Sequence, residues 1–88
     1  MLIKNCMEDL VFNCIVDVLS KYPEFCSCDK CRADVAALAL NNLPPKYIAT
    51  YEGEVYAKIP TLQQQFGTDI LCAVVKAMEI VQKSPRHN

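Results

Sequence analysis

The stretch CSCDKC, residues 26–31, decides how we expect this chain to fold, because it places three thiols close together between two helix-forming segments. Cys28 and Cys31 have the C-x2-C spacing of a zinc knuckle, and Cys26 adds a third sulfur two residues upstream. Such a cluster can clamp a metal, cycle electrons, belong to a disulfide framework or fill a core.

The sequence around the cluster favours metal binding. In a thioredoxin-like redox protein the CxxC pair opens a helix after a strand, whereas here the preceding segment has the pattern of a helix. Glu8 and Asp9 interrupt the apolar run that a signal peptide would continue, so we expect a cytoplasmic protein, in which structural disulfides are disfavoured. We therefore expect a structural zinc ion, bound by Cys26, Cys28 and Cys31, to hold two helices together.

The spacing does not identify a fourth zinc ligand, although zinc usually takes four. His87 is the only histidine, and its place in a short tail is more typical of a solvated residue. The other cysteines fall on or beside apolar helix faces, where a free thiol behaves as a small hydrophobe, so we expect core roles for them. The candidates are Cys6, Cys14, Cys72, His87, a residue of a partner chain and water.

Length and charge limit the other possibilities. The chain has 88 residues, 52% of them apolar, and a net charge of −1. This length fits one domain, residues 1–88, that buries a small core. Acidic and basic residues are nearly balanced, whereas a nucleic-acid-binding protein usually has an excess or a cluster of basic residues. No apolar stretch approaches the roughly 20 residues that span a bilayer. We expect neither direct nucleic-acid binding nor a membrane segment.

Helices are predicted on both sides of the cysteine loop. Apolar residues from Ile3 to Leu19 recur at spacings of three and four, which predicts an amphipathic helix that ends near Lys21, before Pro23. Asp29 is a candidate cap for a second helix, with Val35, Leu38 and Ala39 facing inward. That helix should end at the asparagines and prolines of NNLPP, residues 41–45.

The remaining sequence predicts a hairpin and a long helix. β-Branched and aromatic residues flank Glu52-Gly53 in KYIATYEGEVYAKI, residues 46–59, which is typical of two short strands and a turn. Pro60 suits the first position of a helix whose apolar stripe runs from Leu62 to Val81, with a break at Gly67 as an alternative. The expected fold is mainly α, a small three-helix domain with a short β-hairpin and a cysteine-bound zinc loop.

Several stretches together resemble the late competence development protein ComFB family. They are Asn5-x-Met7-Glu8, the cysteine loop, Asp34 to Ile48, Gly53, Gln65-Phe66-x-x-Asp69 and Pro85-Arg86-His87. The most specific is A-L-N-x-L-P-P-x-Y, residues 39–47. The resemblance implies a small cytosolic homodimer with a cysteine-bound zinc, and a regulatory role as a receptor for a cyclic dinucleotide second messenger. The alternative is a structural or adaptor dimer in competence for DNA uptake, with an unknown protein partner.

A nucleotide site would need amides, a cation and aromatic rings. Such groups gather around the second helix and the LPP turn, although local caps and turns also explain each one. We do not expect an enzyme, because no nucleophile–base pair, catalytic carboxylate pair or phosphate loop is present. The candidate nucleotide-binding residues are Asp34, Asn41, Asn42, Lys46, Tyr47, Tyr51 and Arg86.

Overall fold

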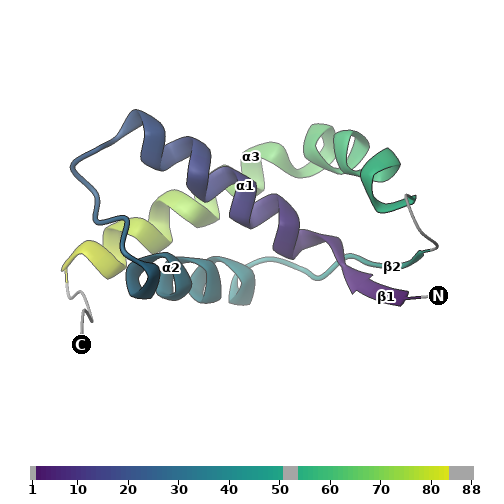
Figure 1. Ribbon diagram of the computed structural model, residues 1–88, viewed down its shortest axis with the longest axis horizontal. Helices are drawn as coiled ribbons and strands as arrows, with labels where there is room; N and C mark the ends of the chain where they lie inside the picture. Colours follow the sequence, from purple (N-terminus) through teal and green to yellow (C-terminus); the bar gives the residue numbers. More distant parts are fainter. Residues whose placement is uncertain (1, 51–53, 84–88) are drawn as a thin grey trace.

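The computed structural model describes residues 2–50 and 54–83. In chain order the elements are β1 (Leu2–Asn5), α1 (Cys6–Lys21), α2 (Asp29–Asn41), β2 (Tyr47–Thr50) and α3 (Glu54–Lys83). The helices pack on one another, the two strands lie at one end of the molecule, and the loop between α1 and α2 lies at the other (Figure 1). The expected fold class, three helices with a small two-stranded antiparallel sheet, is confirmed.

The first element differs from the prediction. Residues 2–5 form a strand, whereas we expected the first helix to include Ile3, whose side chain is 72% exposed. Asn5 ends the strand and caps α1, because its Oδ1 accepts from the N–H of Met7 at 3.1 Å. The same oxygen accepts from the N–H of Lys46 at 2.9 Å, which ties the start of α1 to the chain just before β2. The end of α1 at Lys21 agrees with the prediction.

The sheet joins segments that are far apart in the sequence. β1 and β2 pair antiparallel, with Leu2 opposite Thr50 and Asn5 opposite Tyr47. The predicted hairpin is therefore wrong in its second half, because residues 54–59 begin α3 instead of returning as a strand. Val55, Ile59 and Leu62 have helical spacing that continues into the later apolar stripe, and this longer periodic segment prevails over the β-forming composition. The expected turn at Gly53 lies outside the described residues.

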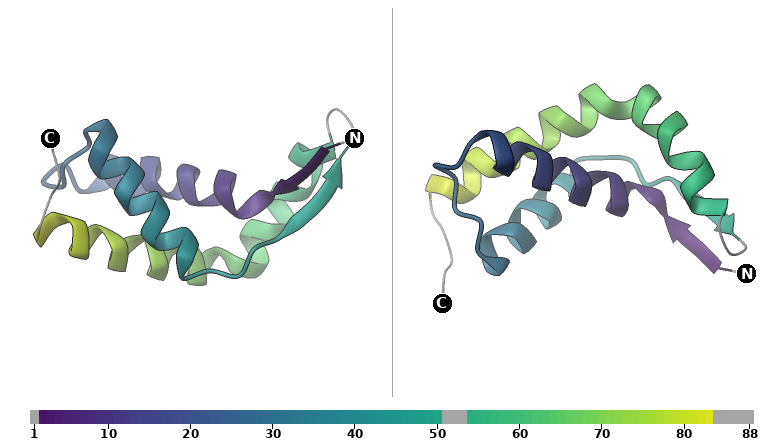
Figure 2. Two further views of the ribbon diagram at one scale, coloured as in Figure 1. Left: turned by 90° about the horizontal axis from the view of Figure 1, so that it is seen from below. Right: turned by 45° about the horizontal axis from the view of Figure 1, so that its top comes forward.

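Helix α3 is a single helix of 30 residues, so the alternative of a break at Gly67 is wrong, and Pro60 lies inside the helix instead of at its first position. Figure 2 shows that α3 curves over the other elements. Helices bend at residue types such as Pro and Gly, and Pro60 and Gly67 are both in this helix. Its C-terminal half packs against α1 and α2, and a smaller contact reaches β2.

The core lies where the three helices meet. Leu10, Val11 and Ile15 of α1 are buried against Val35 and Ala39 of α2. Helix α3 completes the core with a stripe that the sequence predicted, namely Ile70, Val74, Ala77, Met78 and Val81. No helix in residues 2–50 and 54–83 has both the length and the apolar character that crossing a membrane requires.

Candidate metal centre

The loop that carries the cysteines leaves α1 through a tight turn. The N–H of Tyr22 donates to the carbonyl of Val18 at 3.0 Å and closes α1. Pro23 follows, and the N–H of Phe25 donates to the carbonyl of Tyr22 at 3.2 Å. The Tyr22 and Phe25 rings also meet edge to face, with centroids 6.3 Å apart. These contacts turn the chain back toward the helices just before Cys26.

Cys28 and Cys31 are held by the start of α2. Cys28 is the N-cap residue, with extended torsion angles, and its Sγ accepts from the N–H of Cys31 at 3.4 Å. We expected Asp29 to be the cap, and this is wrong, because Asp29 is the first helical residue. An N-cap residue and the residue three positions later lie on the same side of a helix start. The C-x2-C spacing therefore brings these two sulfurs together as soon as α2 forms.

Cys26 is anchored to α3, which no local sequence pattern indicated. Its N–H donates to Oε1 of Gln82 at 3.3 Å, across 56 residues of sequence. Met78 and Val81 of α3 also line a small pocket together with Cys26 and Cys31. The cysteine loop is therefore fixed by the end of α1, the start of α2 and the C-terminal half of α3.

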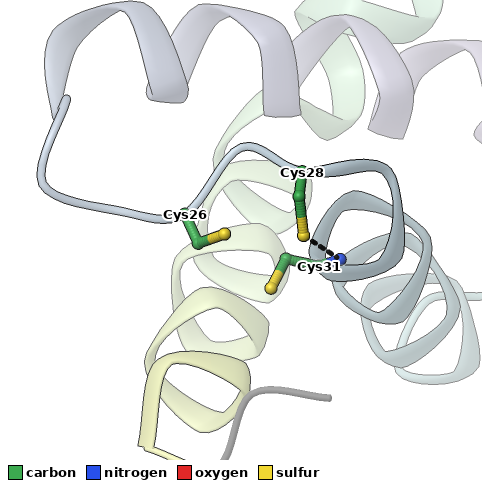
Figure 3. Close-up of side chains that lie close together, drawn as sticks. All are labelled: Cys26, Cys28 and Cys31. Atoms are coloured by element: carbon green, nitrogen blue, oxygen red, sulfur yellow. Dashed lines mark hydrogen bonds between the residues drawn. The ribbon is translucent and has the colours of Figure 1, made fainter. Parts of the chain in front are cut away.

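The three sulfurs form one cluster. The Sγ atoms of Cys26, Cys28 and Cys31 all lie within 4.8 Å of one another, and Figure 3 shows the three side chains close together between the loop and the start of α2. Three thiolates on one tetrahedral zinc, at Zn–S of about 2.3 Å, stand roughly 3.8 Å apart. The observed spacing is close enough for small side-chain rotations to complete such a set. The group can therefore hold a metal ion.

Burial differs across the cluster and explains its electrostatics. Cys31 is 2% exposed, Cys26 is half-buried and Cys28 is exposed. Burial, followed by hydrogen bonds with Cys26 and Cys28 and by the negative charge of those sulfurs, raises the pKa of Cys31 to about 12. The three sulfurs therefore cannot all be ionised at once unless a cation compensates their negative charge. A bound metal ion would provide that positive charge.

The other predicted ligands do not join this cluster. Among the described residues, Cys6, Cys14 and Cys72 lie outside the group of three. Cys6 is buried at the start of α1, as expected for a core thiol. Cys14 is half-buried, and burial followed by the charge of Asp17 raises its pKa, with Lys21 acting in the opposite direction. Cys72 is exposed, so its expected core role is wrong.

None of the other described cysteines therefore adds a fourth ligand to this group, and His87 lies outside the described residues. Cys72 follows the buried Ile70 by two residues, which is about 200° around a helix at about 100° per residue, so it lies on the side of α3 opposite the buried stripe and its phase was misjudged.

The candidate nucleotide-binding residues are dispersed. Asn42 caps α2, and its Nδ2 donates to the carbonyl of Leu38 at 2.9 Å. Lys46 places its Nζ 4.9 Å from the centre of the Phe66 ring, and its carbonyl accepts from the N–H of Cys6 at 2.8 Å. The Tyr47 side chain is 65% exposed on β2.

Two further members of this set lie in α2. Asn41 is exposed at the end of α2, and Asp34 is half-buried within that helix. Tyr51 and Arg86 lie outside the described residues. The described candidates thus lie in α2, at its C-cap, in β2 and in the chain just before β2.

A large groove runs along the outer face of α3, and we call it the α3 groove. It has a volume of about 1100 Å³ and is mainly apolar, with Leu71 and Ile80 exposed. Asn42, Leu43 and Pro44 form one side of the groove. The side contributed by α3 consists of Asp69, Leu71, Cys72, Ala73, Val75, Lys76, Glu79 and Ile80.

Comparisons with known proteins identify the family and agree with the fold. The family described as late competence development protein ComFB matches residues 4–85. Competence protein ComFB of Bacillus subtilis (strain 168) is 32% identical over 60 residues, which cover 68% of this chain and 61% of that relative. The alignment therefore spans less than two thirds of the relative's length.

A solved structure agrees over nearly the whole chain. It is described as a structural characterization of the late competence protein ComFB from Bacillus subtilis and matches with a TM-score of 0.74 at 26% identity. The match covers 98% of this chain and 97% of the other, so the two chains share the same overall fold.

Proposed function

This chain belongs to the late competence development protein ComFB family, and on that premise we propose that it is a small cytoplasmic regulatory binding protein, stabilised by zinc, and not an enzyme. The observation that carries the metal part of the proposal is the convergence of Cys26, Cys28 and Cys31 within 4.8 Å. Zinc supplies a tetrahedral Lewis-acidic centre that binds thiolates, and here its role is structural.

The zinc ion would connect all three helices. Cys31 belongs to α2, Cys28 caps it, and Cys26 is hydrogen-bonded to Gln82 of α3. In zinc-finger peptides the metal contributes about 10–16 kcal/mol at neutral pH, which becomes folding free energy. Protein purified without chelator should carry about one zinc per chain by elemental analysis. Protein that contains none, and binds none when zinc is added, would end this proposal.

We place the dimer interface at the α3 groove, where the occupant would be a second copy of this chain. Lys76 lies on the same helix face as Asp69 and Glu79, among exposed apolar side chains. When two α3 helices pack antiparallel about a twofold axis, Lys76 of each copy lies opposite an acidic residue of the other. This self-complementary charge pattern favours a second copy over an unrelated partner.

The interface is testable by substitution. Leu71→Glu places a charge in the apolar part of the groove and should shift light scattering from a dimer to the 9.9 kDa chain. Val16→Glu on α1 is the matched control, because Val16 is also exposed and apolar but lies outside the groove. Equal effects of both variants, or a monomeric wild-type protein, would refute this interface.

For the ligand we propose a cyclic dinucleotide. The exposed ring of Tyr47 offers a stacking surface, and Lys46 next to it offers a cation for phosphate. A ligand at 100 times its Kd adds about 2.7 kcal/mol to the stability, which thermal shift detects. We expect a shift with one cyclic dinucleotide and none with its linear form. Tyr47→Ala should abolish the shift, while Tyr22→Ala in the cysteine loop should not.

The alternative is an adaptor dimer in competence without a small-molecule ligand. The spread of the described candidate nucleotide residues over α2 and β2 and the apolar lining of the α3 groove favour this alternative. A panel of cyclic and linear dinucleotides that gives no thermal shift, together with a stable dimer, would support the adaptor and exclude the receptor.

A further inference from the structure

We propose that the cysteine cluster is also a site of reversible oxidation, at which Cys28 and Cys31 form a disulfide when the protein is free of metal and meets a peroxide. The disulfide and a bound metal exclude each other, because both need the same two sulfurs. The claim that the disulfide and the metal exclude each other rests on the proposed zinc site, whereas the claim that the disulfide forms does not.

The geometry selects Cys28 as the thiol that reacts first. It is exposed, so a small oxidant reaches its sulfur from solvent, whereas Cys31 is buried beneath it. The two sulfurs lie within 4.8 Å of each other, and the Cys31 N–H is hydrogen-bonded to the Cys28 sulfur at 3.4 Å. An oxidised Cys28 is therefore next to a protected second thiol.

The same helix start favours this pair over pairs with Cys26. Residues three apart at a helix start are neighbours, and a disulfide requires Cα atoms about 4.4–6.8 Å apart. Cys28 has the extended torsion angles of a cap residue, φ −66° and ψ 160°, so it can adjust without disrupting helical residues. Cys26 is held in the loop by Gln82 of α3.

The other thiols are poor partners. Cys72 is exposed but lies outside the cluster, and Cys6 is buried at the start of α1. Cys14 is half-buried on α1 and is also outside the cluster. Oxidation within one chain therefore concentrates at the cysteine loop.

The reaction balances with hydrogen peroxide as the oxidant. The Cys28 thiolate attacks one peroxide oxygen, an S–O bond forms, the O–O bond breaks, and the hydroxide that leaves takes up a proton as water. The Cys31 sulfur then attacks the sulfenic acid, an S–S bond forms, the S–O bond breaks, and a second water leaves. Two thiols are oxidised and one peroxide is reduced. A dithiol reductant reverses the change.

Oxidation would have a direct consequence for the metal. Thiolates bind zinc, but disulfide sulfurs carry no negative charge, so only Cys26 of the three would remain as a thiolate ligand. Zinc that is already bound should in turn protect both sulfurs. The cluster would hold the metal under reducing conditions and release or refuse it after oxidation.

The test compares metal-free and zinc-loaded protein, each treated with one equivalent of hydrogen peroxide, alkylated and digested with trypsin. Lys30 lies between the two cysteines, so trypsin separates them and a Cys28–Cys31 disulfide joins two peptides. We expect this linked pair in metal-free wild-type protein and in Cys26→Ser, several-fold less of it in zinc-loaded protein, and its disappearance after dithiothreitol. Cys28→Ser should lack it.

Two results would overturn the inference. One is a dimer linked through a Cys72 disulfide that forms before the Cys28–Cys31 disulfide. Cys72→Ser protein cannot form that dimer and should still form the Cys28–Cys31 disulfide. The other is sulfinic acid on Cys28 without any link. If wild-type protein binds no zinc but forms the disulfide, the zinc proposal fails and the oxidation site stands. If it binds zinc and forms no link, the oxidation site fails alone.

Discussion

Replacing Gly67 with alanine should stabilise the protein. Gly67 lies inside α3, and a Cβ built at this position has no atom within 4 Å among the surrounding residues that the structure describes. Glycine in a helix interior is about 0.8–1.0 kcal/mol less favourable than alanine, because it loses more backbone freedom on folding. With no collision to offset this gain, we expect the free energy of unfolding to rise by about 1 kcal/mol.

The change is measurable by urea unfolding followed by helical circular dichroism, with zinc in excess. A gain of about 1 kcal/mol raises the melting temperature by roughly 4–8 °C in a domain of this size. The slope of the free energy of unfolding against urea concentration should not change. Ala37→Gly on the exposed face of α2 is the matched control, and it should lower stability by a similar amount. Gly67→Pro should lower stability by about 3 kcal/mol or more.

A loss of stability in Gly67→Ala would refute the reasoning in one of two ways. Either α3 is not continuous at this position, or the added methyl group meets a second copy of the chain. Measurement at two protein concentrations separates them, because only the second explanation makes the loss depend on concentration.

Three further predictions concern the metal cluster and the helix cap. Cys28→Ser should lower the zinc content well below one per chain by elemental analysis and destabilise the fold, while Cys72→Ser, which is exposed and outside the cluster, should do neither. Asn5→Ala should lower the free energy of unfolding in urea by about 1–3 kcal/mol, because two backbone N–H groups lose their acceptor. Asn5→Asp keeps an acceptor oxygen and should lose less stability. Equal losses in the two variants would contradict this role of Asn5. Metal-free protein should lose stability as the pH rises from about 9 toward 12. The pKa of Cys31 is raised from 9.0 to about 12 in the folded chain, so in this range the folded chain keeps a proton that the unfolded chain has lost. Cys31→Ala should weaken this pH dependence, and an unchanged profile would show that Cys31 is not its source.

The sequence predicted the features that depend on local chemistry. Pro23 and the pair Asn42 and Pro44 mark the ends of α1 and α2, and the structure ends both helices there. The apolar stripe of α3 from Ile70 to Val81 is buried as its period indicated. Two of the three cluster sulfurs were also predictable, because C-x2-C at a helix start fixes their separation.

The features that the sequence did not reveal depend on contacts between distant residues. Ile3 has helical spacing from Met7, but residues 2–5 form a strand because β2, more than 40 residues later, pairs with them. The contact between Cys26 and Gln82 spans 56 residues and has no sequence motif. The helix that begins at Glu54 is a different case, because the helical spacing of Val55, Ile59 and Leu62 was present in the sequence but was outweighed by the β-forming composition around Gly53.

The position of Asn5 also constrains the order of events during protein synthesis. Its Oδ1 accepts hydrogen bonds from Met7, two residues away, and from Lys46, 41 residues away. The residues of the first helix are synthesised before residue 46, so Asn5 lacks its second hydrogen bond until the middle of the chain has been made and has folded back. The chain entropy lost on closing this loop is offset only when β2 pairs with β1. The amino-terminal strand is therefore expected to be among the last parts of the nascent chain to settle.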